Sequence, residues 1–462
     1  MAAPECVIVG AGPAGVRAAE VLVAAGLRPI LVEEGRASGG QIYRRQPEGF
    51  RRSAATLYGS EAAKAVALHA TADRLKTTVD WRPETLAWGL RDGALHLVDA
   101  DGRASSSKPD ALIVAAGATD RVFPVRGWTL PGVYTLGAAQ ISLKAQAMAI
   151  GRRVVFLGAG PLLYLVAWQY LKAGNAPVAV LDTSRFADRL AGLPGMMARP
   201  GVVWLGLKYL LALRRAGVPI VTGVTPLAFE GGGEGDDRSV AAVRFVDGGG
   251  RERSIGCDAV GFGWHLRAET QLADLAKVPF DYHPRLRQWL PRADAQGRTP
   301  VAGVYLAGDG LQLAGADGAE ASGRLAAFAV LEGLGLPVDA AERAKALAEN
   351  ARMKRFRDGL ARAFPWPGER LARALGDEAV VCRCEEVTAG TLRASVRDLG
   401  AAEVNRAKAF SRVGMGRCQG RYCGLASAEI VAAALGVPVE TVGRLRGQAP
   451  VKPLPANVEV AP

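Results

Sequence analysis

Four of the six cysteines lie in the last quarter of the chain, at spacings typical of a metal or iron–sulfur centre. Cys382 and Cys384 form a C-x-C pair, and Cys418 and Cys423 form a C-x4-C pair inside GMGRCQGRYCG. On an extended segment the thiols of the first pair would face the same side. The glycines around the second pair would free backbone N–H groups to point at sulfur. Four thiolates suit either a [2Fe–2S] cluster or tetrahedral zinc, and the spacing leaves both open, although zinc more often uses C-x2-C pairs.

A second group of residues with chemical meaning follows the first apolar run of the chain. This run, VIVG, leads into Gly10, Gly12 and Gly15 in the G-x-G-x-x-G spacing, and a helical pattern begins at Pro13 and Ala14. In this context the first glycine permits a tight turn and the second lets backbone N–H groups approach a pyrophosphate. The third lets the helix pack closely on the strand. The sequence therefore predicts a bound dinucleotide, with its pyrophosphate at the helix N-terminus.

The residues after the next apolar run, PILV, are expected to extend this site. Glu33 ends the run and is placed to accept hydrogen bonds from an adenosine ribose, and Glu34 is a second candidate. The loop that follows contains Gly39 and Gly40, which would let the backbone pass close to the ligand. Gln41 would then be within reach to hydrogen-bond it.

Two later strands are expected to end beside the same ligand. The apolar run that begins at residue 111 ends in the small residues Ala116 and Gly117, which leave room for a cofactor at the carboxyl edge of a parallel sheet. Another run leads into Gly308 and Asp309. An aspartate at a strand end can accept hydrogen bonds from ribityl or ribose hydroxyls, while the helix that follows points its dipole at phosphate or at the flavin.

The opening strand–turn–helix–strand unit is repeated from residue 152 onward, with one defect. Gly158 and Gly160 occupy the first two glycine positions, but Leu163 stands at the third, where it should push the helix away or alter the turn. Asp182 ends the unit at the position of a ribose-binding carboxylate, which favours NAD over NADP. A nucleotide site and a retained fold with a poor or repurposed site both stay open.

Composition limits the classes of protein to be considered. The 462 residues are 49% hydrophobic and 22% charged, with a net charge of +12, which is typical of an ordinary globular chain. The basic residues are scattered without a long run, which argues against nucleic acid. No signal peptide or apolar span of roughly 20 residues is present. We therefore expect a cytoplasmic protein, peripheral to the inner membrane at most through its complex.

The residues quoted above resemble a known family when they are taken together. GAGPAG, LVEEGRASGGQIYR, AAGATDR, the second unit GAGPLL and AGDG are similar to the flavoprotein superfamily with two dinucleotide domains. CRCEEVT and GMGRCQGRYC resemble the bacterioferritin-associated-ferredoxin (BFD) type of [2Fe–2S] domain. The nearest branch is that of the large subunits of bacterial amine and imino-acid dehydrogenases.

The resemblance implies an α/β fold with two Rossmann-like three-layer domains, the second inserted in the first, and a small, mainly α-helical [2Fe–2S] domain at the C-terminus. The expected boundaries are 1–145 with 280–338 for the FAD domain, 146–279 for the NAD(P)-like domain, 339–374 for a helical connector, 375–446 for the BFD-like domain and 447–462 for a tail.

The resemblance also assigns the cofactors. Cys382, Cys384, Cys418 and Cys423 would hold a [2Fe–2S] cluster, and whether NAD(P) binds the second unit stays open. The expected FAD-binding residues are Gly10, Gly12, Pro13, Ala14, Gly15, Glu33, Glu34, Gly40, Gln41, Ala116, Gly117, Gly308 and Asp309.

The function implied is that of an electron-transfer component in an FAD-dependent dehydrogenase acting on CH–NH bonds, of the opine, hydroxyproline, proline or sarcosine type. A smaller FAD-containing subunit would oxidise the amine, and a small ferredoxin-like subunit often completes such complexes. The alternatives are a self-contained NAD(P)H-dependent flavin reductase and a scaffold with vestigial sites. No redox cysteine pair precedes Cys382, so thiol–disulfide chemistry is not expected, and no catalytic acid or base is assigned.

Overall fold

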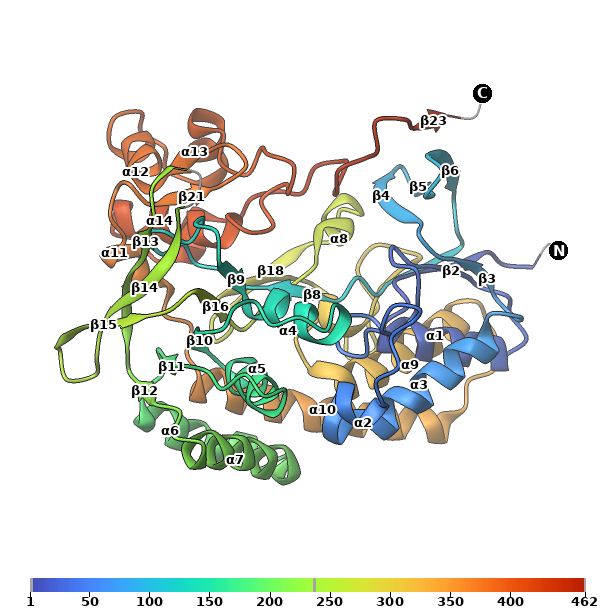
Figure 1. Ribbon diagram of the computed structural model, residues 1–462. Coiled ribbons are helices and arrows are strands. Elements are labelled where there is room, and N and C mark those ends of the chain that lie inside the picture. The colour runs from blue at the N-terminus through green and yellow to red at the C-terminus, as the bar shows by residue number, and fades with distance from the viewer. Residues whose placement is uncertain (1–2, 236–237, 461–462) are drawn as a thin grey trace.

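The first of two parallel sheets organises the N-terminal part of the protein in the computed structural model, which describes residues 3–235 and 238–460 (Figure 1). Its central strands are buried throughout, as expected for a parallel sheet covered on both faces. In spatial order the strands are β20 (Val304–Leu306), β7 (Ala111–Val114), β1 (Cys6–Val9), β2 (Ile30–Val32) and β3 (Asp80–Arg82). β20 therefore rejoins this sheet after the whole second sheet has formed.

Alternate residues of the first sheet face two different layers. Ile8 packs among helices, whereas Val7 and Val9 pack against a small antiparallel sheet and α8 (Gln271–Leu275). The helices are α1 (Pro13–Ala24), α2 (Ala54–Tyr58), η1 (Gly59–Glu61), α3 (Ala62–Leu75) and α9 (Gly315–Gly333). The antiparallel strands are β4 (Leu86–Arg91), β5 (Ala94–Val98) and β6 (Arg103–Ser107), and the two-residue strand β23 (Glu459–Val460) is added parallel to β6.

The second parallel sheet is built in the same way. Its order is β12 (Ile220–Thr222), β11 (Ala179–Asp182), β10 (Val154–Ala159), β16 (Ala259–Trp264) and β9 (Val133–Thr135). Four helices belong to this unit, α4 (Leu136–Ala145), α5 (Pro161–Lys172), α6 (Phe186–Met196) and α7 (Pro200–Arg215). A meander of β13 (Thr225–Gly232), β14 (Ser239–Val246) and β15 (Glu252–Gly256) is added to it.

Short pairs of strands lie between the two units. β8 (Ala118–Asp120) pairs with β17 (Leu266–Ala268), and β18 (Phe280–His283) forms a hairpin with β19 (Gln288–Pro291). The single turn η3 (Gly308–Gly310) follows β20.

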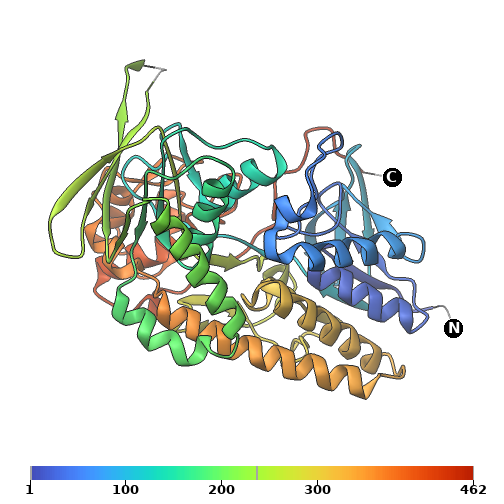
Figure 2. The ribbon, with the colours of Figure 1, turned by 60° about the horizontal axis from the view of Figure 1, so that its bottom comes forward.

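The C-terminal part is a mainly helical unit reached through a long helix. α10 (Ala340–Ala363) runs beneath both α/β units and contacts α6 and α9 (Figure 2). The unit itself contains α11 (Gly368–Ala374), β21 (Val380–Cys382), β22 (Val387–Thr388), α12 (Ala389–Arg397), α13 (Val404–Ser411), α14 (Gly424–Leu435) and η4 (Val439–Val442). The expected fold class, with two Rossmann-like units and a small helical domain at the C-terminus, is confirmed.

The expected domain boundaries stay a proposal, and two features bear on them. β9, which we had placed with the first unit, pairs with β16 of the second sheet. The tail beyond residue 446 runs back to the first unit, where β23 pairs with β6 (Figure 1). On the way, the backbone N–H of Val451 donates to the carbonyl oxygen of Trp88 at 2.9 Å. Residues 1–2 and 461–462 lie outside the part of the chain that is described.

A close approach of two helices gives a test of this packing. α1 and α9 touch so tightly that a Cβ at Gly323 would overlap the backbone oxygen of Ala14, whereas a Cβ at the helical Gly206 would meet nothing within 4 Å. We expect Gly323→Ala to lower the free energy of unfolding by about 1–3 kcal/mol. Gly206→Ala should raise it by up to about 1 kcal/mol, because alanine loses less backbone entropy than glycine. Thermal unfolding of both variants checks this, and equal melting temperatures would contradict the helix contact.

Candidate cofactor sites

The glycines of the first unit form a tight turn and a close contact between helix and strand. A Cβ at Gly10 would overlap the carbonyl oxygen of Ala115, and a Cβ at Gly15 would overlap that of Gly10, so the turn and the helix contact both exclude side chains. Around Gly12 the space is more open, because its Cβ would meet only the Cα of Gly40, at 3.7 Å. This opening lies at the start of α1, where Pro13 is the first helical residue and backbone N–H groups have no helical partner.

The two glutamates that follow β2 have different surroundings. The Glu33 carboxylate accepts hydrogen bonds from the N–H groups of Ala11 at 2.7 Å and Gly35 at 2.8 Å, which fixes it beside the glycine turn. The exposed Glu34 carboxylate is paired with the ammonium group of Lys452 in the tail. Glu33 is therefore the better placed of the two to meet a ribose.

The glycine loop after β2 passes close to the start of α1. Gly40 has a φ of +61°, and a Cβ there would lie 3.0 Å from the Cα of Gly12. Gln41 is exposed, and its side-chain oxygen accepts from the Arg44 guanidinium at 2.7 Å. The loop backbone at Gly40 therefore lies against the start of α1, whereas the side-chain oxygen of Gln41 is already engaged by Arg44.

The two later strand ends meet at this edge of the sheet. Gly117 has a φ of +74°, and a Cβ there would meet nothing within 4 Å, so open space lies in front of it. Ala116 and Gly117 are both partly exposed. At Gly308 a Cβ would lie 2.9 Å from the side chain of Ala14, so this turn packs on α1. The open space at Gly12 and Gly117, with a carboxylate at Glu33, fits an extended dinucleotide.

Asp309 stands at the start of the α9 segment. Its Oδ1 accepts from the N–H groups of Ala314 at 2.8 Å and Gly315 at 3.0 Å, and burial raises the pKa of this carboxyl. The side chain thus orders the beginning of α9, and it lies just after β20 at the end of a strand of the first sheet.

The corresponding site of the second unit is filled by side chains of the chain itself. Asp182 is fully buried, and its Oδ2 accepts from Tyr164 at 2.6 Å and from Arg189 at 2.7 Å. Its Oδ1 accepts from the hydroxyl and the N–H of Ser184, both at 2.7 Å. Both oxygens are engaged, so a ribose would have to displace these partners.

The glycine turn of the second unit is covered as well. A Cβ at Gly160 would lie 3.1 Å from the imidazole Nδ1 of His265, and the Nε2 of that ring lies 2.6 Å from the carbonyl oxygen of Phe364. Burial lowers the pKa of His265 to about 4, so the ring is neutral at pH 7. Leu163 is fully buried in the core of this unit. These contacts favour a retained fold whose nucleotide site has another use.

The four cysteines of the C-terminal unit come together. Cys382 ends β21, but Cys384 lies in the following turn, so the expectation of one extended segment for both was wrong. The Cys423 thiol lies within hydrogen-bond contact of the sulfurs of Cys382 and Cys418, and this contact lowers the pKa of Cys382 to about 6 and that of Cys418 to about 5. The same contacts raise the pKa of Cys423. Cys384 in turn contacts Cys418.

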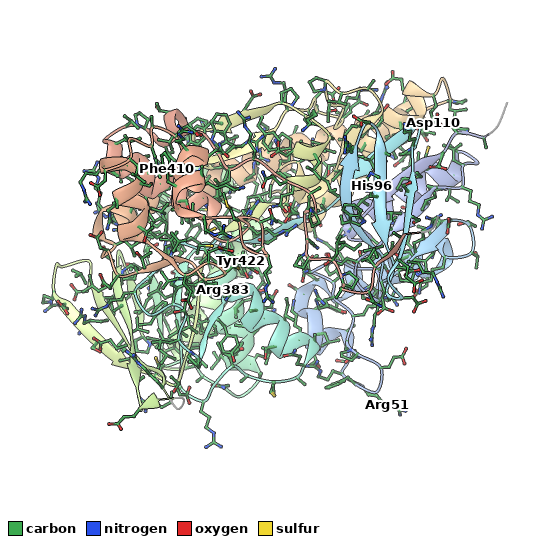
Figure 3. All side chains as sticks on the ribbon, turned by 90° about the horizontal axis from the view of Figure 1, so that it is seen from above. Arg51, His96, Asp110, Arg383, Phe410 and Tyr422 are labelled. Carbon is green, nitrogen blue, oxygen red and sulfur yellow. The ribbon has the colours of Figure 1, made fainter. Side chains whose placement is uncertain are left out.

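Backbone N–H groups surround the sulfurs, as expected from the glycines. Gly414 donates to the sulfur of Cys382, and Gly420 donates to that of Cys418. Beside them the Arg383 guanidinium lies 5.3 Å from the centre of the Tyr422 ring (Figure 3). Thiolates with several N–H donors are typical of iron–sulfur ligands, whose potentials depend on such hydrogen bonds.

The four thiols lie close to one another. Cys423 contacts Cys382 and Cys418, and Cys384 contacts Cys418 and lies near Cys382. Four thiolates suit either a [2Fe–2S] cluster, which takes two on each iron, or tetrahedral zinc, which takes four around one centre. These contacts alone do not choose between the two.

A buried ion pair connects the two candidate sites. The backbone N–H of Glu269 donates to the carbonyl oxygen of Gly117 at 3.0 Å. The Glu269 carboxylate accepts from the Nε of Arg421 at 2.8 Å, and the two side chains are 9% and 10% exposed. Arg421 belongs to residues 414–423, which we call the cysteine loop, and it lies between Cys418 and Cys423.

Two neighbours of Glu269 reinforce this contact. Arg267 donates to the carbonyl oxygen of Arg421 at 2.6 Å, and the side-chain amide of Gln271 donates to that of Gln419 at 2.8 Å. Three alternate residues therefore hold the cysteine loop against the end of the β7 segment. We did not predict Arg267, Glu269, Gln271 or Arg421 as functional. The one sequence signal was a charged residue inside the cysteine motif, at Arg421.

Two dinucleotide-type units joined to a four-thiolate domain define a flavin oxidoreductase with an iron–sulfur centre. Residues 4–333 match the family model for pyridine nucleotide-disulphide oxidoreductases, and residues 380–433 match that of the BFD-like [2Fe-2S] binding domain. The first match covers more than half of the chain, so the protein belongs to the pyridine nucleotide-disulphide oxidoreductase family. It carries FAD as its flavin. Its C-terminal unit is a [2Fe–2S] domain and not a zinc domain.

Similar proteins match almost the whole chain. An opine oxidase subunit from Agrobacterium tumefaciens (strain Ach5) is 37% identical, over 97% of this chain and 90% of its own length. Hydrogen cyanide synthase subunit HcnB of Pseudomonas aeruginosa is 29% identical, over 97% of both chains. The crystal structure of L-proline dehydrogenase from P. horikoshii superposes with a TM-score of 0.68 at 20% identity, covering 99% of this chain and 79% of the other, and supports the fold.

Replacement of single cysteines tests the thiolate centre. We expect Cys423→Ala to abolish the visible absorption and the electron paramagnetic resonance signal of the cluster, because it removes one of the four expected ligands, the thiol that contacts both Cys382 and Cys418. Cys257→Ala is the matched control, since Cys257 is also buried and burial raises its pKa to about 11. This control should keep the cluster in full. Loss of the cluster in both variants would indicate a general folding defect.

Proposed function

We propose that the chain is the FAD- and [2Fe–2S]-containing electron-transfer component of a multi-subunit dehydrogenase that oxidises the carbon–nitrogen bond of an amine or imino acid. Opine-, hydroxyproline-, proline- and sarcosine-type substrates belong to this class. Two relatives, hydrogen cyanide synthase subunit HcnB and the opine oxidase subunit, are named as parts of larger enzymes, which supports this proposal. A smaller FAD-containing subunit would hold the substrate, a ferredoxin-like subunit would complete the assembly, and the complex would be cytoplasmic.

The observation that carries the proposal is the contact of Glu269 with both Gly117 and Arg421. We assign Gly10, Gly12, Gly15, Glu33, Gly117 and Asp309 to FAD, together with the neighbouring residues expected there, and the four C-terminal cysteines to the cluster. The flavin supplies two-electron oxidation and the cluster supplies single-electron transfer. The chain's own residues bind the two groups and fix the cysteine loop beside the flavin site. No side chain of this chain is proposed as a catalytic acid or base.

The rival function is a self-contained NAD(P)H-dependent flavin reductase. Because the partners of Asp182 and the ring of His265 occupy the second nucleotide site, we expect neither NADH nor NADPH to reduce the flavin of the purified chain. Anaerobic titration followed in the flavin absorption band measures this, with dithionite as the positive control. Rapid bleaching by NADH alone would favour the reductase.

The ion pair gives a second test of the relay. We expect Glu269→Ala to leave Arg421 buried without its partner, which costs about 3 kcal/mol and loosens the cysteine loop. Hydrogen exchange of the amides in residues 414–423 should rise on the order of a hundredfold, and transfer from reduced flavin to cluster should slow.

The matched control for this variant is Asp274→Ala. The Asp274 carboxylate accepts hydrogen bonds from both terminal guanidinium nitrogens of Arg444, at 2.6 and 2.7 Å. This ion pair joins α8, which follows Glu269, to the C-terminal part, and Asp274 does not touch the cysteine loop. We expect flavin-to-cluster transfer to stay fast in this control. An equal effect of the two variants on transfer would contradict a specific role for Glu269.

A further inference from the structure

The helices α6 and α7 expose a large apolar surface. We call it the α6–α7 face. More than half of the large hydrophobic side chains found exposed in the described residues belong to it, and Phe186 and Trp204 are 67% and 60% exposed. Its members are Phe186, Leu190, Leu193, Met197, Val202, Trp204, Leu207 and Leu211. Single exposed apolar residues are normal, but a cluster of this size marks an interaction site.

Each helix already has its packing partner on the opposite side. α6 approaches α10 so closely that Cβ atoms at Gly192 and Gly195 would clash with Gly359. α7 packs on α5, where Tyr209 stacks on Trp168 with 4.5 Å between ring centres.

In α6 the exposed Phe186, Leu190 and Leu193 follow at spacings of four and three residues, which is one face of a helix. In α7 the exposed Trp204, Leu207 and Leu211 follow at spacings of three and four residues and also share one face. The packing of the chain itself therefore does not use the α6–α7 face. Both helices lie at the lower edge of the molecule in Figure 1.

The polar residues of this surface carry one sign of charge. The described residues 185–217 expose Arg185, Lys208, Arg214 and Arg215 and no acidic side chain. They contain no Ser, Thr, Asn, Gln or Glu. The Asp188 carboxylate is half-buried and accepts from the N–H of Arg185 at 2.8 Å. The ammonium group of Lys208 lies 5.7 Å from the centre of the Trp204 ring.

We infer that the α6–α7 face binds the surface of an anionic lipid bilayer. Tryptophan, phenylalanine and leucine with a border of lysine and arginine are typical of helices that lie in the headgroup region. The exposed polar side chains of residues 185–217 are all cationic, which favours an anionic headgroup layer over a protein surface of mixed polarity. In the described part of the chain no helix is long and apolar enough to cross a membrane, so binding is peripheral. This inference requires only the two helices and is independent of the proposed function.

Sedimentation with vesicles tests the inference on the full, flavin-loaded chain. We expect the protein to bind vesicles of phosphatidylcholine and phosphatidylglycerol in equal parts, and to bind pure phosphatidylcholine much more weakly. Leu207→Gln with Leu211→Gln should reduce the partition coefficient roughly tenfold or more. The reason is that transfer of a leucine side chain from water to the bilayer lowers the free energy, and a glutamine side chain lacks this contribution. Lys208→Glu with Arg215→Glu should remove the preference for anionic vesicles.

Matched controls separate this surface from general effects. Val66→Gln with Leu399→Gln alters exposed apolar residues elsewhere, 53% and 57% exposed, and should leave binding unchanged. Flavin content and the far-ultraviolet spectrum verify folding of every variant. Absence of binding to either kind of vesicle, or equal loss in the controls, would overturn the inference. So would a concentration-dependent dimer that the Leu207 and Leu211 variant dissociates, since the face would then be a protein interface.

Discussion

The ion pair between Glu269 and Arg421 places two charges where almost no solvent reaches them. A buried charge without a partner is strongly destabilising, so each of these side chains requires the other. One partner is tied by its own backbone to Gly117, and the other stands between two cysteines of the cysteine loop. Together with the hydrogen bonds of Arg267 and Gln271 to the same loop, this ion pair fixes the cysteine loop beside Gly117.

The local parts of both sites could be predicted because their causes are local. Gly15 is required by a contact with the backbone of Gly10 five residues before it, and the spacing of the glycines records this constraint. Gly10 also meets Ala115 after the neighbouring strand β7, but the tight turn that it makes is a local feature. The cysteine pairs are equally local. Such patterns reveal what a segment can bind, and with the resemblance they were sufficient for the fold class.

The residues that were missed depend on contacts between distant segments. Glu269 and Arg421 meet across more than 150 positions, and the sequence contains no sign of their pairing. Asp182 could not be decided from the sequence, since its position is that of a ribose-binding carboxylate. Its engagement by Tyr164 and Arg189 depends on side-chain directions that periodicity does not give. β9 joined the second sheet for a similar reason, because three residues carry too little pattern to choose between two parallel sheets.

The second unit explains why a nucleotide fold is retained when its nucleotide site is filled. The same edge of the sheet that would face a nucleotide holds the connector to the iron–sulfur domain. His265 bonds the carbonyl oxygen of Phe364, Arg370 donates to the carbonyl oxygens of Thr183 and Val224, each at 3.3 Å, and the rings of Trp264 and Trp366 meet edge to face. One hydrophobic core runs from this sheet into the C-terminal unit. The carboxyl edge of the second sheet therefore works as a docking surface for the domain that carries the thiolates, and filling it is what keeps the cysteine loop within reach of Glu269.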